Sequence, residues 1–159
     1  MVLGILATIL VIAGGVAGGI YYAKHHDSTS SAAGGAEALK TKPVVTAGEG
    51  TLTELTVKTL VEGGGAPVTA GQTLSVNYVG VSYKTGEEFD SSWSRSQPFD
   101  VVIGQGQVIE GWDKGLIGVK VGSRVQLDIP AAMAYGDEAS TSGAPTGPLR
   151  FVVDVISAA

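Results

Sequence analysis

The sequence offers few side chains of the kinds that perform covalent or metal chemistry. Its 159 residues include no cysteine, which excludes a thiolate nucleophile, a disulfide and a zinc-thiolate site. The two histidines, His25 and His26, are adjacent and follow an apolar run, and we interpret them as solvated residues. The segment GQGQVIEG at 104–111 lacks the spacing of a phosphate-binding loop, and no serine-hydrolase or zinc-protease motif occurs. We therefore predict no metal site and no cofactor.

One carboxylate differs from the other acidic residues. Asp90 follows Phe89 and precedes two serines, a pattern that indicates a polar group at the end of an apolar strand. The neighbouring acids at 87 and 88 stand beside a predicted hairpin turn and are typical of a solvated face. Asp90 is therefore the carboxylate for which we consider a role in a site.

Aromatic residues are few, yet most of them fall in one stretch of predicted β-structure. They could form an ordinary aromatic core or the lining of a ligand site, and composition alone does not separate these interpretations. The residues concerned are Tyr78, Tyr83, Phe89, Phe99, Trp112, Tyr135 and Phe151.

Alternation of apolar and polar residues from residue 51 onward predicts the strands that must position these side chains. Such alternation indicates an antiparallel sheet with one face buried and one face wet. The segment KTG at 84–86 predicts a turn between two of the strands. The residues predicted to point inward are Leu55, Val57, Val61, Leu74, Val76, Tyr78, Val125, Leu127, Ile129, Leu149, Phe151, Val153 and Val155.

The stretch VIEGWDKGLIGVKVG at 108–122 is the one helix predicted after the N-terminal run. Val108, Trp112 and Leu116 recur at four-residue spacing and predict an apolar stripe. The glycines at 111, 115 and 118 each cost about 1 kcal/mol relative to alanine inside a helix, so packing must hold the segment. Two of them, Gly111 and Gly115, leave room for a sheet to approach. Trp112 then lies against that sheet, as a core plug or as part of a binding site.

The N-terminal part of the chain has a different composition. Residues 2–23 carry no charge and, at about 1.5 Å per residue, are long enough to cross a hydrocarbon core about 30 Å thick. We predict a transmembrane anchor at 1–23, with a cleaved signal peptide or a buried helix as alternatives. Residues 24–50 are small and polar and predict a flexible tether, which leaves 51–159 as the folded domain.

Composition limits the class of the domain and its partners. The net charge of −5 and the lack of any basic run argue against nucleic acid as a partner. The 24 glycines indicate many turns and close backbone approaches, which favours an all-β or α+β domain over a helical bundle.

Five motifs, in order and spacing, resemble the FKBP-type peptidyl-prolyl cis-trans isomerases over residues 54–156. The motifs are NYVG, TGEEFDSSW, QPFDVVIGQGQVIEGWDKGLIGVKVG, IPAAMAYGD and LRFVVDVI. The resemblance implies an α+β fold in which an antiparallel sheet wraps around one short helix, preceded here by the predicted transmembrane helix. It also implies an enzyme that accelerates isomerisation of X-Pro bonds, with proline-containing polypeptides as substrates and macrolide immunosuppressants as further ligands.

The same resemblance implies a pocket between helix and sheet, with Trp112 as its floor. It suggests that the Ile109 backbone N–H and the Tyr135 hydroxyl hold carbonyl groups of the ligand. We expect Asp90 to orient Tyr78 and Arg95 instead of acting as a base. The substrate-binding positions matched by motif are Tyr78, Phe89, Phe99, Val108, Trp112 and Phe151.

One segment departs from the family pattern. Residues 137–148 are rich in Ser, Thr, Gly and Pro and lack the bulky aliphatic side chains that overhang the pocket in many members. We expect weaker macrolide binding and an altered substrate preference, with some activity retained.

Three functions remain open on these residues. We predict a monomeric, membrane-anchored isomerase that assists folding of exported proteins, with its domain outside the cytoplasm. Lys24 on the C-terminal side of the anchor argues for the opposite orientation, because positive charges favour the cytoplasmic side. The alternatives are a non-catalytic chaperone or peptide-binding module with the same pocket, and a structural spacer on a membrane tether.

Overall fold

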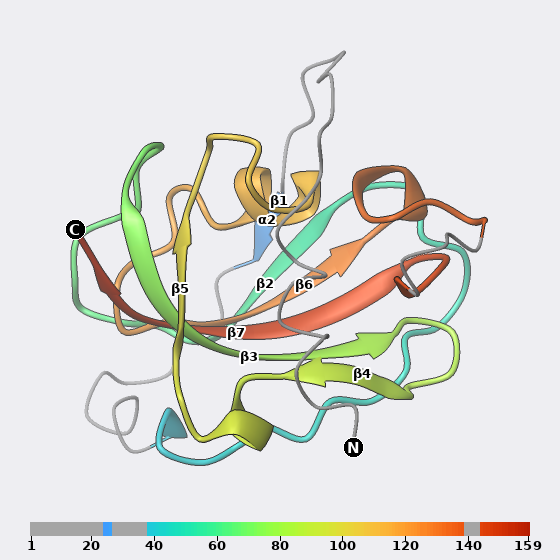
Figure 1. Cartoon of the computed structure of the whole chain (residues 1–159), viewed down its shortest axis with the longest axis horizontal. Helices are drawn as coiled ribbons and strands as arrows, with labels where there is room; N and C mark the ends of the chain where they lie inside the picture. The colour runs from blue at the N-terminus through green and yellow to red at the C-terminus, as the bar shows by residue number, and fades with distance from the viewer. Residues whose placement is uncertain (1–23, 27–37, 139–143) are drawn as a thin grey trace.

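The computed structural model describes residues 24–26, 38–138 and 144–159. Its strands form one seven-stranded sheet in the order β1-β2-β6-β7-β3-β4, and β5 pairs with β3 beside β4 (Figure 1). The strands are β1 (Lys24–His26), β2 (Thr56–Val61), β3 (Thr73–Ser82), β4 (Glu88–Ser91), β5 (Phe99–Val102), β6 (Arg124–Ile129) and β7 (Leu149–Ala158). The helical elements are α2 (Glu110–Gly115) and the 3-10 turns η2 (Trp93–Arg95) and η3 (Ala131–Met133).

The sheet is antiparallel, as predicted, apart from one pair of strands. β1 runs parallel to β2, with Lys24 opposite Thr56 and His26 opposite Lys58. These three residues extend the sheet, whereas the sequence predicted them to lie within a tether. The hairpin turn predicted at 84–86 is present, since Gly86 has a positive φ of 76° and its N–H donates to the Ser82 carbonyl.

The predicted alternation correctly identifies the inner face of the sheet. Every predicted inward residue of β6 and β7 is fully buried and packs into one core with residues of α2. Val61 is the exception among the predicted inward residues, because it is only half-buried and follows a register shift in the pairing of β2 with β6. The fully buried residues of β6 and β7 are Val125, Leu127, Ile129, Leu149, Phe151, Val153 and Val155.

The outer face of β6 and β7 is drier than the sequence predicted, because two ion pairs on it lie under another segment. Arg124 and Asp154 are paired across the strands and joined by two hydrogen bonds of 2.6 and 2.8 Å. Arg150 and Asp128 form an equivalent pair with bonds of 2.7 and 3.1 Å. Both aspartates are buried. An outward position on a strand therefore need not be a wet one.

The covering segment is residues 41–49, which we call the strap. Arg124 donates to the Thr41 carbonyl at 2.7 Å, and Arg150 donates to the carbonyls of residues 46 and 47 at 3.1 and 3.2 Å. The strap then meets Tyr83, whose hydroxyl donates to the Glu49 carbonyl and whose own carbonyl accepts from the Gly48 N–H, both at 2.7 Å. The strap falls within the predicted tether, so contacts with the domain begin ahead of residue 51.

Packing holds the short helix α2 against the inner face, as the glycine pattern predicted. A Cβ atom on Gly111 would lie 2.5 Å from Ile129, and one on Gly115 would lie 3.0 Å from Leu127. Both approaches are closer than ordinary side-chain contact, so a methyl group at either position would force Ile129 or Leu127 of β6 to shift, Ile129 by more. Residue 118 lies beyond the helix with a positive φ of 89°, and so it serves the turn that follows.

The predicted anchor at 1–23 lies outside the described residues. Within the described ranges, no helix is both long enough and apolar enough to cross a membrane.

Candidate active site

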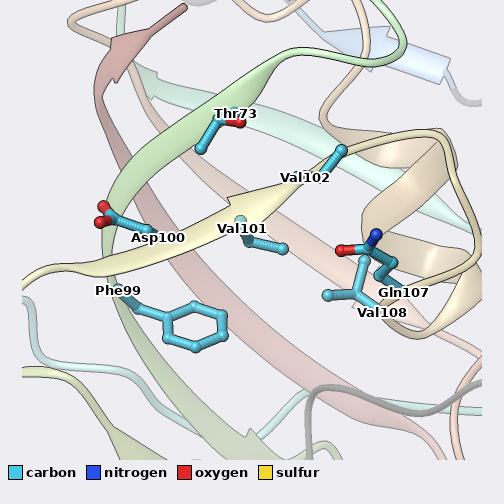
Figure 2. Close-up of a pocket in the computed structure, with 7 residues that line it drawn as sticks. All are labelled: Thr73, Phe99, Asp100, Val101, Val102, Gln107 and Val108. Carbon is cyan, nitrogen blue, oxygen red and sulfur yellow. The ribbon is translucent and has the colours of Figure 1, made fainter.

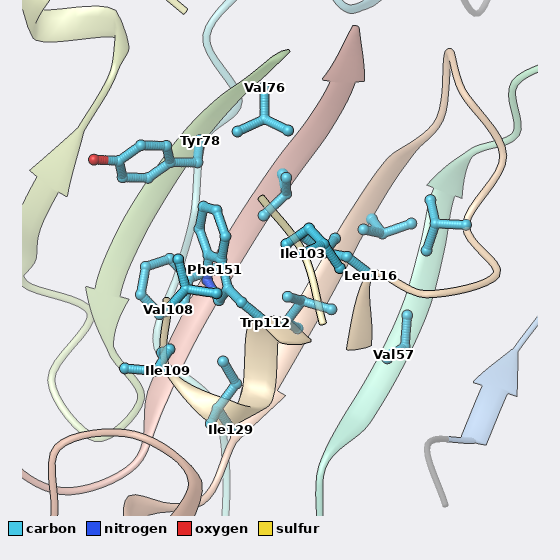
Figure 3. Packing of buried hydrophobic residues seen from close by; sticks show 14 of the residues in the cluster. Val57, Val76, Tyr78, Ile103, Val108, Ile109, Trp112, Leu116, Ile129 and Phe151 are labelled. Carbon is cyan, nitrogen blue, oxygen red and sulfur yellow. The ribbon is translucent and has the colours of Figure 1, made fainter. Parts of the chain in front are cut away.

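Five aromatic rings from five different elements meet over the inner face of the sheet. We call them the five-ring cluster: Tyr78 of β3, Phe89 of β4, Phe99 of β5, Trp112 of α2 and Phe151 of β7. The rings of Tyr78, Trp112 and Phe151 are fully buried, and Figure 3 shows them converging. The structure thus brings together aromatic residues that are up to 73 positions apart in the sequence.

Edge-to-face contacts hold the five-ring cluster together. The Trp112 ring centroid lies 5.3 Å from that of Tyr78 and 5.4 Å from that of Phe151, with interplanar angles of 83° and 87°. Phe99 lies 5.9 Å from Tyr78, and Phe89 lies 5.5 Å from Phe151. Such geometry brings the positive ring edge to a negative face and fixes the orientation of each ring.

Trp112 is fully buried at the centre of the cluster, which is the position of a core residue. Among the described residues none accepts a hydrogen bond from its buried indole Nε1. Buried indole N–H groups usually have a partner, since the buried polar atom otherwise loses its bond to water. Trp93 Nε1 is also buried without a partner among the described residues, so this feature by itself does not separate a binding site from a core.

Asp90 is tied to two neighbours, as the sequence predicted. The Tyr78 hydroxyl donates to its Oδ2 at 2.6 Å, and Arg95 Nη1 donates to its Oδ1 at 3.0 Å. Arg95 Nη2 also donates to the Tyr78 hydroxyl at 2.8 Å, which closes a three-membered network. Since Asp90 is 4% exposed and accepts from both partners, its carboxylate holds their orientation and has little access to a substrate proton.

The network keeps Tyr78 neutral. Burial, followed by the hydrogen bond to Asp90 and its negative charge, raises the pKa of Tyr78 above its ordinary value of 10.0, and Arg95 opposes this only in part. Burial and then the charge of Asp90 also raise the pKa of the half-buried Tyr135. Tyr135 packs against the same core as Tyr78, the residue that donates to Asp90.

The loop before α2 carries the predicted carbonyl-binding N–H. Ile109 is fully buried, and its carbonyl accepts from the N–H groups of Trp112 and Asp113 at 3.0 and 3.2 Å. Its own N–H, by contrast, donates to no acceptor in the part of the chain that the structure describes. Val108 beside it is 1% exposed and packs in the same core. All nine residues predicted for the site thus lie in or next to one region.

An open groove of about 220 Å³ borders this region along β5 (Figure 2). It contains Phe99 and Val108, which the sequence predicted for substrate binding, and five residues that the sequence analysis did not single out. Exposed polar residues such as Asp100 carry no pattern that distinguishes a groove from an ordinary surface. The five added residues are Thr73, Asp100, Val101, Val102 and Gln107.

Two further contacts of the site went unpredicted. Ser92 is buried, accepts from the Tyr78 N–H at 2.9 Å and donates to Asn77 at 2.9 Å, so it anchors β3 beside the network. The side chain of Asp113 accepts from two main-chain N–H groups of the preceding loop. The serine pair after Asp90 was the only sequence signal for the contact of Ser92.

The atypical loop at 137–148 includes residues 139–143, which lie outside the described ranges.

Comparison with known proteins places this geometry in a family context. The family model described as FKBP-type peptidyl-prolyl cis-trans isomerase matches residues 64–156. A protein named FK506-binding protein from Streptomyces anulatus is 51% identical over 106 residues, covering 65% of this chain and 86% of that protein. A probable FK506-binding protein from Corynebacterium glutamicum is 43% identical over 105 residues, covering 66% of this chain and 87% of that protein.

Solved structures are similar over about two thirds of the chain or more. The crystal structure of AtFKBP13 superposes with a TM-score of 0.60 at 33% identity, covering 67% of this chain and 94% of that one. FkpA from Escherichia coli gives a TM-score of 0.59 at 29% identity, covering 79% of this chain and 58% of FkpA.

Proposed function

We propose that the five-ring cluster binds the prolyl ring of the substrate. The chain belongs to the FKBP-type peptidyl-prolyl cis-trans isomerases, and the proposal starts from that membership. The observation that carries the proposal is the contact of Trp112 with the rings of Tyr78 and Phe151 at the centre of the five-ring cluster, beside Asp90. The indole of Trp112 is fully buried in this structure, so a prolyl ring reaches it only when neighbouring rings move apart. The cluster then supplies apolar contact without a covalent step.

The reaction needs no nucleophile. Resonance holds the X-Pro amide planar, and uncatalysed exchange has an activation energy of about 20 kcal/mol. A site accelerates rotation when it binds the twisted amide more tightly than either planar form. The twisted amide is less polar than the planar one, so an apolar environment of aromatic rings favours it.

Hydrogen bonds complete the proposed mechanism. The Ile109 N–H, which has no acceptor within the described residues, binds one carbonyl of the peptide. The Tyr135 hydroxyl binds a second carbonyl, and its raised pKa keeps the hydroxyl proton in place as a donor at neutral pH. Asp90 orients Tyr78 and Arg95. Together these contacts hold the peptide on both sides of the rotating bond.

The test is cis-to-trans exchange of a short X-Pro peptide by the chain and by Tyr135→Phe, with Tyr83→Phe as the matched control. Tyr83 also carries a hydrogen-bonded hydroxyl, but it lies under the strap and outside the five-ring cluster. We expect the parent to accelerate exchange. In Tyr135→Phe, kcat/KM should fall about fivefold, because one hydrogen bond of about 1 kcal/mol is lost. Tyr83→Phe should leave kcat/KM unchanged. A folded parent that binds proline peptides without accelerating exchange would instead favour the non-catalytic binding module.

We also propose that residues 1–23 anchor the enzyme in a membrane with its domain outside the cytoplasm, where it assists folding of exported proteins. Support comes from the uncharged run at 2–23 in the sequence. Protease treatment of intact cells tests the location. Cleavage of the domain supports the proposal, and protection of the domain until the membrane is broken contradicts it.

Macrolides are proposed as further ligands of the five-ring cluster, and they should compete with the peptide for it.

A further inference from the structure

We infer that Asp113 is a positioning residue that fixes the loop from Gly104 to Ile109 in the conformation that binds substrate. The inference rests on the proposed role of the Ile109 N–H. Asp113 contacts no ring of the five-ring cluster, and the sequence analysis assigned it no role. Its contacts concern only the main chain of the loop, which is why a motif search does not find it.

The Asp113 carboxylate holds the middle of the loop with both of its oxygens. Oδ1 accepts from the Gly104 N–H and Oδ2 accepts from the Gly106 N–H, each at 2.8 Å. The two glycines have φ values of 83° and 72°, in the left-handed region that glycine adopts at low cost. This backbone conformation presents two N–H groups to one carboxylate, and such charge-assisted bonds are stronger than neutral ones.

The same residue also holds the far end of the loop. The Asp113 backbone N–H donates to the Ile109 carbonyl at 3.2 Å, next to the bond from the Trp112 N–H at 3.0 Å. At the near end, Ile103 forms two hydrogen bonds with the turn just ahead of β3. Its N–H donates to the Gln72 carbonyl at 3.0 Å, and its carbonyl accepts from the Gly71 N–H at 2.7 Å. Asp113 therefore ties the loop between two fixed ends to the helix that carries Trp112.

The loop has few other restraints. Residues 104–107 are exposed, and within the described ranges Asp113 is the one side chain that accepts hydrogen bonds from their N–H groups. The helix α2 has only six residues, two of them glycine, so it does not rigidify the loop by itself. Without the carboxylate, the exposed part of the loop ahead of Val108 and Ile109 loses its side-chain restraint, whereas these two residues keep their packing in the core. A displacement of about 1 Å at a substrate contact can cost up to a hundredfold in rate.

The experiment compares three variants of the full chain. Asp113→Asn keeps the size of the side chain but replaces one acceptor oxygen with an NH₂ group that faces an N–H. Asp113→Glu keeps the charge, so it tests rescue by the conservative residue. Glu110→Gln is the matched control, because Glu110 lies on the same helix and its carboxylate pairs with Lys114 at 2.6 Å. For each variant we would measure KM and kcat with an X-Pro peptide, the melting temperature, and the amide NMR signals of Gly104 and Gly106.

We expect Asp113→Asn to lower kcat/KM about tenfold, mainly through a higher KM, because the Ile109 N–H binds the carbonyl in planar and twisted peptide alike. The two glycine amide signals should shift in the same variant, Asp113→Glu should recover part of the loss, and Glu110→Gln should match the parent. Shifted glycine signals with unchanged KM and kcat would overturn the inference, since the clamp would then not position the site. An inactive parent with intact glycine signals would instead contradict the proposed function.

Discussion

At the scale of single residues, Asp90 shows how a carboxylate can serve a site without exchanging protons. It is nearly buried, accepts from Tyr78 and Arg95, and therefore keeps its charge satisfied within the protein. Removing one member of a buried charged pair is costly because the partner is left without its bond. These contacts hold the Tyr78 hydroxyl and the Arg95 guanidinium in place beside the five-ring cluster.

The substitution Asp90→Ala should reduce both activity and stability. Tyr78 and Arg95 lose a charged acceptor, and hydrogen bonds to charged groups contribute about 1.5–3 kcal/mol each. We expect the free energy of unfolding to fall by about 2–4 kcal/mol and kcat/KM to fall about tenfold. Urea unfolding and peptide exchange measure the two effects. Glu88→Ala is the control, since Glu88 lies on the same strand, is exposed and pairs with Lys42 at 2.9 Å. Equal effects of the two substitutions would contradict the assignment.

The raised pKa values of Tyr78 and Tyr135 predict the alkaline behaviour of the domain. A group whose pKa is higher in the folded state stabilises the fold fully below its unfolded pKa of 10.0 and loses that contribution as the pH rises further. The contribution of the two tyrosines to the free energy of unfolding should therefore be constant near pH 8 to 9 and should decline above about pH 10. Tyr78→Phe should flatten the decline in urea unfolding measured at several pH values. A decline of unchanged slope in that variant would argue against a buried neutral Tyr78.

At the scale of elements, α2 depends on its contact with β6 and little on its own helix propensity. A Cβ atom at residue 111 would lie 2.5 to 2.7 Å from three carbon atoms of Ile129, whereas one at residue 115 would meet Leu127 at 3.0 Å. The two glycines of the same helix thus differ in how much the sheet must yield to a methyl group.

The substitution Gly111→Ala should destabilise the domain by about 1–3 kcal/mol, because overpacking outweighs a helix-propensity gain of about 1 kcal/mol. Gly115→Ala provides the comparison and should cost less, since its closest contact is longer. Thermal unfolding of the two variants measures the difference. If Gly111→Ala were more stable than the parent, helix propensity and not the close approach to Ile129 would control this element.

At the scale of the whole molecule, the strap joins the segment ahead of the domain to the outer face of the sheet. Its carbonyl groups accept from Arg124 and Arg150, the two arginines that already bind buried aspartates across β6 and β7. Arg150 also lies 5.2 Å from the centroid of the Tyr83 ring, which the strap contacts. The folded unit therefore includes residues that the sequence assigned to a tether.

Deleting residues 1–50 should destabilise the domain, whereas deleting residues 1–37 should keep all of the strap contacts. The strap carbonyls accept from two charged donors, and such bonds contribute about 1.5–3 kcal/mol each when buried. Because these bonds are partly exposed, their loss should lower the free energy of unfolding by about 2 kcal/mol or more. Urea unfolding of the two truncated chains measures the difference. Equal stabilities would show that water replaces the strap at no cost. Because the strap lies on the face opposite the five-ring cluster, peptide exchange by any folded fraction should change little.

The sequence by itself determined the features that depend on local patterns. Two-residue alternation identified the inward side of β6 and β7, four-residue spacing identified the buried stripe of α2, and ordered motifs identified the residues that meet in the site. These predictions succeed because periodicity records which side of an element faces the core. The roles of the nine site residues stay predictions, as do the anchor and its orientation.

Only the tertiary structure decided which polar groups meet. Arg124 and Asp154 are 30 residues apart, and Arg150 lies more than 100 residues from the strap carbonyls that it binds. The contacts of Asp113 with Gly104 and Gly106 depend on the path of one loop. Such partners are set by strand register and chain path, and a polar residue looks the same in sequence whether it faces water or a distant main-chain group. For that reason the wet outer face was predicted where the structure has a covered one.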